Sequence, residues 1–220
     1  TDTLSMEVSY YKVKIDNRIA AISTDRLLSD EIDNGSNPAV VRDADGKIDV
    51  MYSFDQNMAS LETSGFDFKA NYTHETNIGD FSLRGEASYV EEFVEITEAG
   101  ADPFDYAGLQ DYPEWRANMT LDWKYENFGA AWSAYYIGQQ ESGAEEFNNS
   151  SLAAVPSYFK HNAQVSYMHD WNGKVTFGVN NIFDREAPKW YDGFYDYRDA
   201  STELYDVLGR TIFLKVEQTF

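Results

Sequence analysis

The residues best suited to contact a ligand lie in one segment near the end of the sequence. There, aromatic rings stand beside carboxylates and a guanidinium group, and we predict ligand contacts from Trp190, Tyr191, Phe194, Tyr195, Tyr197 and Arg198. Such rings can stack on sugar rings or on aromatic chelators, while the polar groups form hydrogen bonds. The same rings could equally pack against neighbouring loops or lie at the level of lipid headgroups, so both interpretations stay open.

A second acidic segment resembles a calcium loop only in part. Asp43, Asp45 and Asp49 surround Gly46, and calcium sites gather carboxylates around such a turn. The distal glutamate and the full set of ligands are missing from the segment. We therefore favour an Asp-Gly turn at the tip of a hairpin, which is a common use of that dipeptide, and we predict no metal site.

Catalysis has no support in the sequence. The chain has no cysteine, which excludes thiolate chemistry. Its three histidines, His74, His161 and His169, lack the spacing of a shared metal site, and no serine joins them in a nucleophile motif. We expect no enzyme activity and no cofactor. The formal net charge of −21 also argues against nucleic acid as a partner, because phosphate binding needs excess Lys and Arg.

The pattern of the chain is that of β-strands. From residue 115 to 125, apolar and polar side chains alternate strictly, which is the period of a strand. The same alternation occurs at residues 66–73, 81–89, 128–136, 162–167, 175–179 and 212–220, and less regularly at 4–15. These runs approach the roughly 9–11 residues that a tilted strand needs to cross a bilayer. We predict an all-β protein with about eight antiparallel strands.

The connections favour a membrane barrel. Short turns at residues 76–80, 126–127 and 170–173 alternate with long loops, so all short turns lie at one end of the sheet, as in outer-membrane barrels. Aromatic residues near strand ends would form the girdle of such a barrel; they are Trp115, Trp123, Tyr125, Phe128 and Tyr136. A soluble carbohydrate-binding β-sandwich is an alternative, but it would leave the asymmetry of the loops unexplained.

Several segments resemble those of one family. Residues 178–184, Gly-Val-Asn-Asn-Ile-Phe-Asp, resemble the penultimate-strand motif of TonB-dependent receptors. Residues 208–214 resemble the Gly-Arg opening of the last strand in that family, and Phe220 resembles its terminal aromatic residue. Residues 13–19 and 61–67 resemble an outgoing and a returning strand, so the resemblance covers essentially the whole chain.

The resemblance implies a place in a larger molecule. Residues 1–220 would be the C-terminal portion of a transmembrane β-barrel of roughly 22 strands, with the plug and the earlier strands absent from this chain. The implied location is the outer membrane of a bacterial cell. The implied partners are outer-membrane lipid, the remainder of the receptor, TonB through the missing N-terminal part, and a small-molecule or glycan substrate.

The implied function is TonB-dependent active uptake of a scarce extracellular solute, either a siderophore or an oligosaccharide. A small eight-stranded outer-membrane barrel that acts as an anchor or adhesin is the alternative. Polar strand positions could line a transport path, although in plugged barrels they more often bond the plug or one another; they are Arg84, Glu86, Arg116, Asp122 and Lys124. Solvated surface is expected for the acidic loop residues Glu95, Glu98, Asp102, Asp105, Asp111, Glu141, Glu145 and Glu146.

Overall fold

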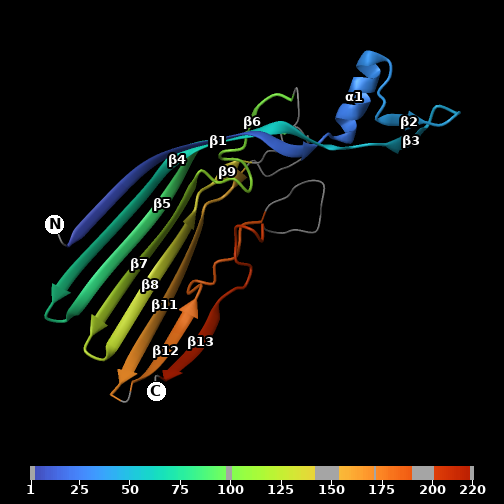
Figure 1. Cartoon of the computed structure of the whole chain (residues 1–220). Helices are drawn as coiled ribbons and strands as arrows, with labels where there is room; N and C mark the ends of the chain where they lie inside the picture. The colour runs from blue at the N-terminus through green and yellow to red at the C-terminus, as the bar shows by residue number, and fades with distance from the viewer. Residues whose placement is uncertain (1–2, 98–100, 142–153, 171, 190–200, 219–220) are drawn as a thin grey trace. The chain divides into compact units, whose positions relative to one another are not determined.

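One sheet dominates the computed structural model, which describes residues 3–97, 101–141, 154–170, 172–189 and 201–218. Its strands follow one another in chain order (Figure 1): β1 (Leu4–Ala21), β4 (Asp55–Thr76), β5 (Gly79–Ile96), β7 (Trp115–Tyr125), β8 (Phe128–Ile137), β11 (Tyr158–His169), β12 (Gly173–Asn180) and β13 (Thr211–Gln218). Each neighbouring pair from β5 to β13 is antiparallel. The predicted all-β class and the strand number are confirmed in the described part of the chain.

Alternation along the strands gives the sheet two different faces. Asp122 of β7 lies opposite Ser82 and Ala131, and the next residue, Trp123, lies opposite Phe81 and Ala130. Because successive side chains point to opposite faces, the sheet has a polar and an apolar side. No helix in the described residues is both long and apolar enough to cross a membrane.

The apolar face is not a packed core. Trp115 and Tyr125 are each 40% exposed and Phe128 is 53% exposed, although all three belong to that face. The rings gather at both strand ends: Trp115 lies 4.8 Å from Tyr89, and Phe128 lies 5.0 Å from Tyr167 beside the short turns. Large apolar groups exposed in this way suit contact with lipid, and their positions match the predicted aromatic girdle.

The contacts divide the chain into two units, which we describe separately. The first unit comprises residues 1–11, 64–91 and 107–220, and it contains the strand ends that form the short turns. Glu126 and Asn172 have φ angles of 49° and 60° at two of these turns, as tight hairpins require. A small pair of strands, β9 (Gln140–Glu141) and β10 (Ala154–Val155), also belongs to this unit.

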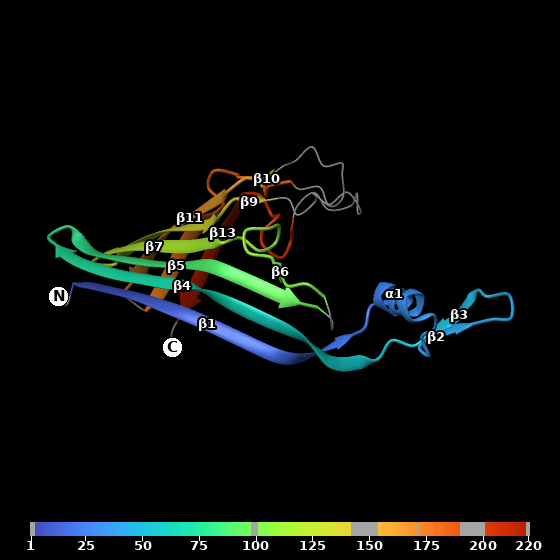
Figure 2. The ribbon, with the colours of Figure 1, turned by 90° about the horizontal axis from the view of Figure 1, so that it is seen from above.

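The second unit comprises residues 12–63 and 92–106. It contains elements that the strand pattern did not predict: α1 (Thr24–Asn34), the hairpin β2 (Val40–Arg42) and β3 (Ile48–Met51), and β6 (Phe104–Asp105), all visible from above in Figure 2. Helix α1 begins where the Arg26 N–H donates to Ser23 Oγ at 3.1 Å, and it ends at Gly35 with φ 75°. A polar cap and a left-handed glycine are ordinary helix boundaries.

The hairpin of the second unit carries the predicted Asp-Gly turn. The Asp43 carboxylate accepts hydrogen bonds from the N–H groups of Asp45 and Lys47, both at 2.9 Å, and Gly46 has φ 79°. Asp43 therefore stabilises the turn itself. Within the described residues, no group of His, Asp and Glu side chains is arranged to hold a metal ion.

The two ends of the strand order are open edges. β1 and β13 each have one neighbour in the sheet and do not pair with each other in the described residues. Ile212, Leu214 and Val216 of β13 are 65% exposed or more. Unpaired strand edges with apolar side chains call for further strands beside them.

Candidate functional site

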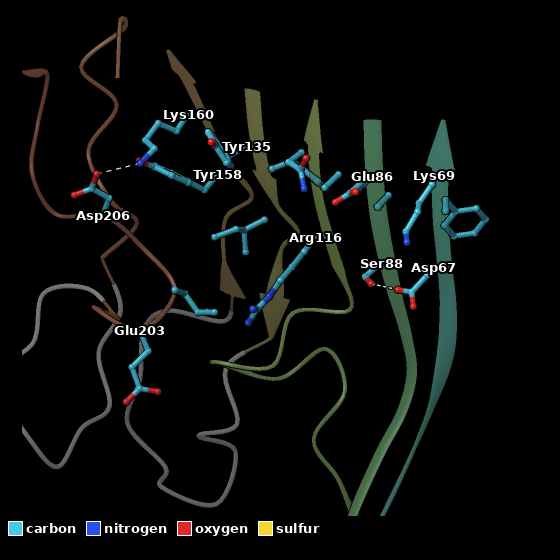
Figure 3. A pocket seen from close by; sticks show the side chains of 17 residues that line it. Asp67, Lys69, Glu86, Ser88, Arg116, Tyr135, Tyr158, Lys160, Glu203 and Asp206 are labelled. Carbon is cyan, nitrogen blue, oxygen red and sulfur yellow. Dashed lines mark hydrogen bonds and ion pairs between the residues drawn. The ribbon is translucent and has the colours of Figure 1, made fainter. Parts of the chain in front are cut away.

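A cavity of about 640 Å³ lies on the polar face of the first unit (Figure 3). Its wall takes residues from five neighbouring strands, β4, β5, β7, β8 and β11, and from a segment just before β13. The charged and polar residues in the wall are Asp67, Lys69, Glu86, Ser88, Arg116, Asn118, Tyr135, Tyr158, Lys160, Glu203 and Asp206. The strand register explains why they meet, because Arg116 lies opposite Ser88 and Lys160 lies opposite Tyr135.

Lys160 links the segment just before β13 to the sheet, because it contacts Asp206 of that segment. Its Nζ lies 3.0 Å from Asp206 Oδ2 and 5.6 Å from the centre of the Tyr135 ring. The hydrogen bond from Lys160 and a second one from the Leu208 N–H lower the pKa of Asp206, which keeps its carboxylate charged. The side chain of Lys160 is mostly buried, so this contact fixes the chain above the wall more firmly than a surface ion pair would.

Other charges on the wall remain available to a ligand. Ser88 Oγ donates a hydrogen bond to Asp67. Lys69, Glu86 and Arg116 have no ion-pair partner among the described residues, and Figure 3 shows them on separate strands. A wall with both cations and anions can bind a polar solute through several charge-assisted hydrogen bonds.

A buried polar cluster adjoins the cavity through Tyr158, which lines the cavity and contacts Tyr205. Gln140 is 1% exposed; its Nε2 donates to Tyr205 Oη at 2.7 Å, and its Oε1 accepts from the Asp111 N–H at 2.8 Å. The Tyr158 ring meets the Tyr205 ring edge-on at 5.2 Å. Burial raises the pKa of Tyr205, so its phenol stays neutral at physiological pH.

The motif at residues 178–184, which resembles that of TonB-dependent receptors, lies at the start of the last long loop. Asn181 has φ 52° and is 2% exposed; its Oδ1 accepts from the Arg185 N–H at 2.8 Å, and its Nδ2 donates to the Arg185 carbonyl at 3.0 Å. Further on, the Arg210 N–H donates to Asp184 Oδ1 at 2.7 Å. Asn181 thus shapes the start of this loop, and Asp184 links its two ends. Phe220 lies outside the described residues.

The predicted contact residues of the last loop, Trp190, Tyr191, Phe194, Tyr195, Tyr197 and Arg198, all lie outside the described residues. Two described residues that follow them in sequence, Glu203 and Asp206, line the cavity. The ligand role of residues 190–198 stays a prediction.

Some of the charged residues that the sequence analysis placed in the strands and acidic loops form ion pairs. Arg84 pairs with Asp122 at 2.6 Å, which fits the expectation that polar-face residues bond one another. Glu95 pairs with Arg18 in the second unit, and Asp102 is exposed. Glu98, Glu145 and Glu146 lie outside the described residues.

The sequence reasoning missed several residues of the cavity. Lys69 and Tyr135 stand at polar-face positions of predicted strands, so strict use of the alternation would have found them, whereas Lys160 lies in the part of β11 that precedes the predicted run of residues 162–167. Tyr205 and Asp206 had no such signal, because they lie in an irregular segment whose place depends on contacts distant in sequence.

Comparisons with known proteins agree with this architecture. The family model described as "TonB dependent receptor-like, beta-barrel" matches residues 1–182. No curated protein is similar enough in sequence to count as a match.

Solved structures match the fold at low sequence identity. A mutant of the ferric enterobactin receptor PfeA from Pseudomonas aeruginosa matches all of this chain with a TM-score of 0.66 and 15% identity. The siderophore receptor PirA from Acinetobacter baumannii matches all of it with a TM-score of 0.62 and 14% identity, and the copper transporter OprC does so with 0.58 and 16%.

The chain spans 29%, 30% and 29% of the length of PfeA, PirA and OprC respectively. The matched family model covers most of the chain, and the two-faced sheet agrees with it. The chain therefore belongs to the TonB-dependent receptors of the bacterial outer membrane, and it forms part of their β-barrel.

Proposed function

We propose that the receptor containing this chain takes up a scarce extracellular solute, a siderophore or an oligosaccharide, by TonB-dependent transport. The observation that carries the proposal is the sheet with an exposed aromatic face and, on its other side, a cavity whose wall contains both cationic and anionic side chains. The first face suits lipid, and the second suits a polar solute in a lumen. Family membership also agrees with the expectation that the chain is not an enzyme.

The open edges support a larger barrel. A small eight-stranded barrel would need β1 to pair with β13, and these strands do not pair in the described residues. We propose that residues 1–220 are the C-terminal portion of the receptor's barrel. The remaining partners would be the other barrel strands, a plug and TonB, the last reached through the N-terminal part of the receptor.

The substrate class is proposed from two sources. Two of the similar structures are a ferric enterobactin receptor and a siderophore receptor, and one is a copper transporter; these similarities favour a metal chelate. The aromatic and polar residues at 190–198 suit either a chelate or a glycan, and we propose them as ligand contacts together with the cavity wall.

An uptake assay tests this proposal. The host strain would be deleted for the receptor and complemented with the full-length gene, and uptake of iron-labelled siderophores and labelled oligosaccharides would be measured. We expect the deletion or the loss of TonB to abolish uptake of one ligand class. Replacing Tyr195 and Arg198 with alanine should weaken uptake without lowering the amount of receptor. Uptake that continues without TonB would refute the proposal.

A further inference from the structure

The second unit contains a cavity of its own, and two exposed aromatic rings form part of its wall. The cavity measures about 550 Å³. The rings of Tyr52 and Phe54 lie parallel within 5°, with centroids 6.1 Å apart, and the two residues are 48% and 61% exposed. Two aromatic rings exposed side by side in a cavity are unusual unless they meet a partner.

Hydrogen bonds hold the chain that presents these rings. The Tyr52 N–H donates to the Ala39 carbonyl at 2.8 Å, and Ser53 Oγ donates to the Ile22 carbonyl at 2.6 Å. Asn37 supports the same wall, because its Nδ2 donates to the Leu27 carbonyl at 3.1 Å and its Oδ1 accepts from the Ala39 N–H at 3.0 Å. The aromatic wall is therefore formed before any ligand binds, which lowers the entropic cost of binding.

The adjacent hairpin is fixed to the helix by a two-point contact. Arg42 Nε lies 2.8 Å from Glu31 Oε1, and Arg42 Nη2 lies 2.6 Å from Glu31 Oε2. This contact lowers the pKa of Glu31, so the carboxylate stays charged. A bidentate pair of this kind fixes orientation as well as distance, and it keeps β2 and β3 against α1.

The chemistry of the cavity selects one class of ligand. Asp30 and Gln56 line it beside the rings and offer hydrogen-bonding groups. The two parallel rings offer parallel aromatic faces on which a flat apolar surface can stack, whereas an aromatic site for an ammonium ion encloses the cation with rings at several angles. The net charge of −21 disfavours an anion. A neutral molecule with one flat apolar side and hydroxyl groups at its edge satisfies all of these features.

We propose that the Tyr52–Phe54 wall is a binding site for a neutral saccharide, with a pyranose ring stacked on the aromatic faces and its hydroxyl groups bonded to Asp30 and Gln56. The inference deepens the proposed function and rests on it, because it takes the second unit to face the external medium. It names a substrate class for a site formed by residues other than 190–198.

Calorimetry with the purified full-length receptor tests the site. The receptor would be held in a detergent without a sugar headgroup and titrated with cellohexaose, xylohexaose, laminarihexaose and maltohexaose. We expect at least one of them to bind. Phe54→Leu keeps an apolar side chain but removes the flat ring, and it should weaken binding by about tenfold.

Controls separate stacking from folding and from transport. Ile32→Ala alters a side chain of α1 that is 79% exposed and is not part of the cavity wall; its binding should be unchanged. The inference is overturned if no hexasaccharide binds, if an aromatic iron chelate binds at this wall instead, or if Phe54→Leu binds as tightly as the wild type. Binding by purified receptor needs no TonB, so saccharide binding without uptake would refute only the proposed function.

Discussion

At the scale of single residues, Asn181 explains why the family-like motif has its sequence. A left-handed backbone is accessible to asparagine at lower cost than to most residues, and its short amide can bond the backbone nearby. Both properties are used here, since Asn181 has φ 52° and makes two hydrogen bonds to the backbone of Arg185. Its N–H also donates to Asn162 Oδ1 at 2.9 Å, which ties the turn to β11.

We predict that Asn181→Ala destabilises the receptor by roughly 1–3 kcal/mol, because partly buried backbone groups of Arg185 lose their partner and alanine resists the left-handed conformation. The midpoint of urea unfolding, followed by tryptophan fluorescence in detergent, measures the change. The neighbouring Asn180 is exposed and bonds only Thr211 in the described contacts, at 3.3 Å. Asn180→Ala should therefore stay within about 0.5 kcal/mol of the wild type, and equal losses for the two variants would contradict this explanation.

At the scale of elements, the strands need close approach at particular points. Gly65 of β4 is buried, and a Cβ added there would overlap with the backbone oxygen of Tyr89 in β5 and meet the Tyr11 hydroxyl at 2.8 Å. Gly85 of β5 has room, because the nearest atom to an added Cβ is the Asn118 carbonyl oxygen at 4.0 Å. Glycine is thus a requirement of packing at the first position and not at the second.

Gly65→Ala should consequently impair assembly of the barrel, at a cost of roughly 1–3 kcal/mol from overpacking against a strand backbone. The fraction of receptor that migrates as a folded, heat-modifiable band in gels of outer membranes would fall. Gly85→Ala is the matched control and should give a normal folded fraction. A normal band for Gly65→Ala would mean that β4 can move away from β5 at little cost.

At the scale of the whole molecule, the open edges make the sheet dependent on other strands. β1 and β13 each leave a row of backbone groups without a strand partner in the described residues. In a membrane such groups must be paired, and in water they promote aggregation. The exposed apolar side chains of β13 also agree with the proposed larger barrel, in which further strands would lie beside this edge.

Residues 1–220 expressed alone should therefore fail to insert as a closed barrel, whereas the full receptor should insert. Heat-modifiable gel mobility and circular dichroism after refolding into detergent would measure both. Because the chain has no cysteine, cysteines introduced into β1 and β13 give a clean crosslinking control. A monomeric fragment with an efficient crosslink between these strands would favour the small-barrel alternative.

The sequence by itself determined the strands, their two faces and the positions of the short turns. These features depend on local rules: side chains alternate with period two, and tight turns need residues that tolerate positive φ. β7 shows this directly, because the predicted bounds of residues 115–125 equal the observed strand. The Asp43–Lys47 turn and the hydrogen bonds between Asn181 and Arg185 also depend on contacts within a few residues.

Only the tertiary structure decided the rest. It extended β4 to residues 55–76, folded residues 24–34 into a helix, and brought Asp206 to Lys160 and Tyr205 to Gln140. Ser23 and Gly35 cap this helix, but a short helix becomes stable only when its apolar side is buried, as Leu27 is here. The last two contacts join residues that are 46 and 65 positions apart in the sequence. Such contacts leave no periodic signal, because they arise from the order of the strands and not from the local chain.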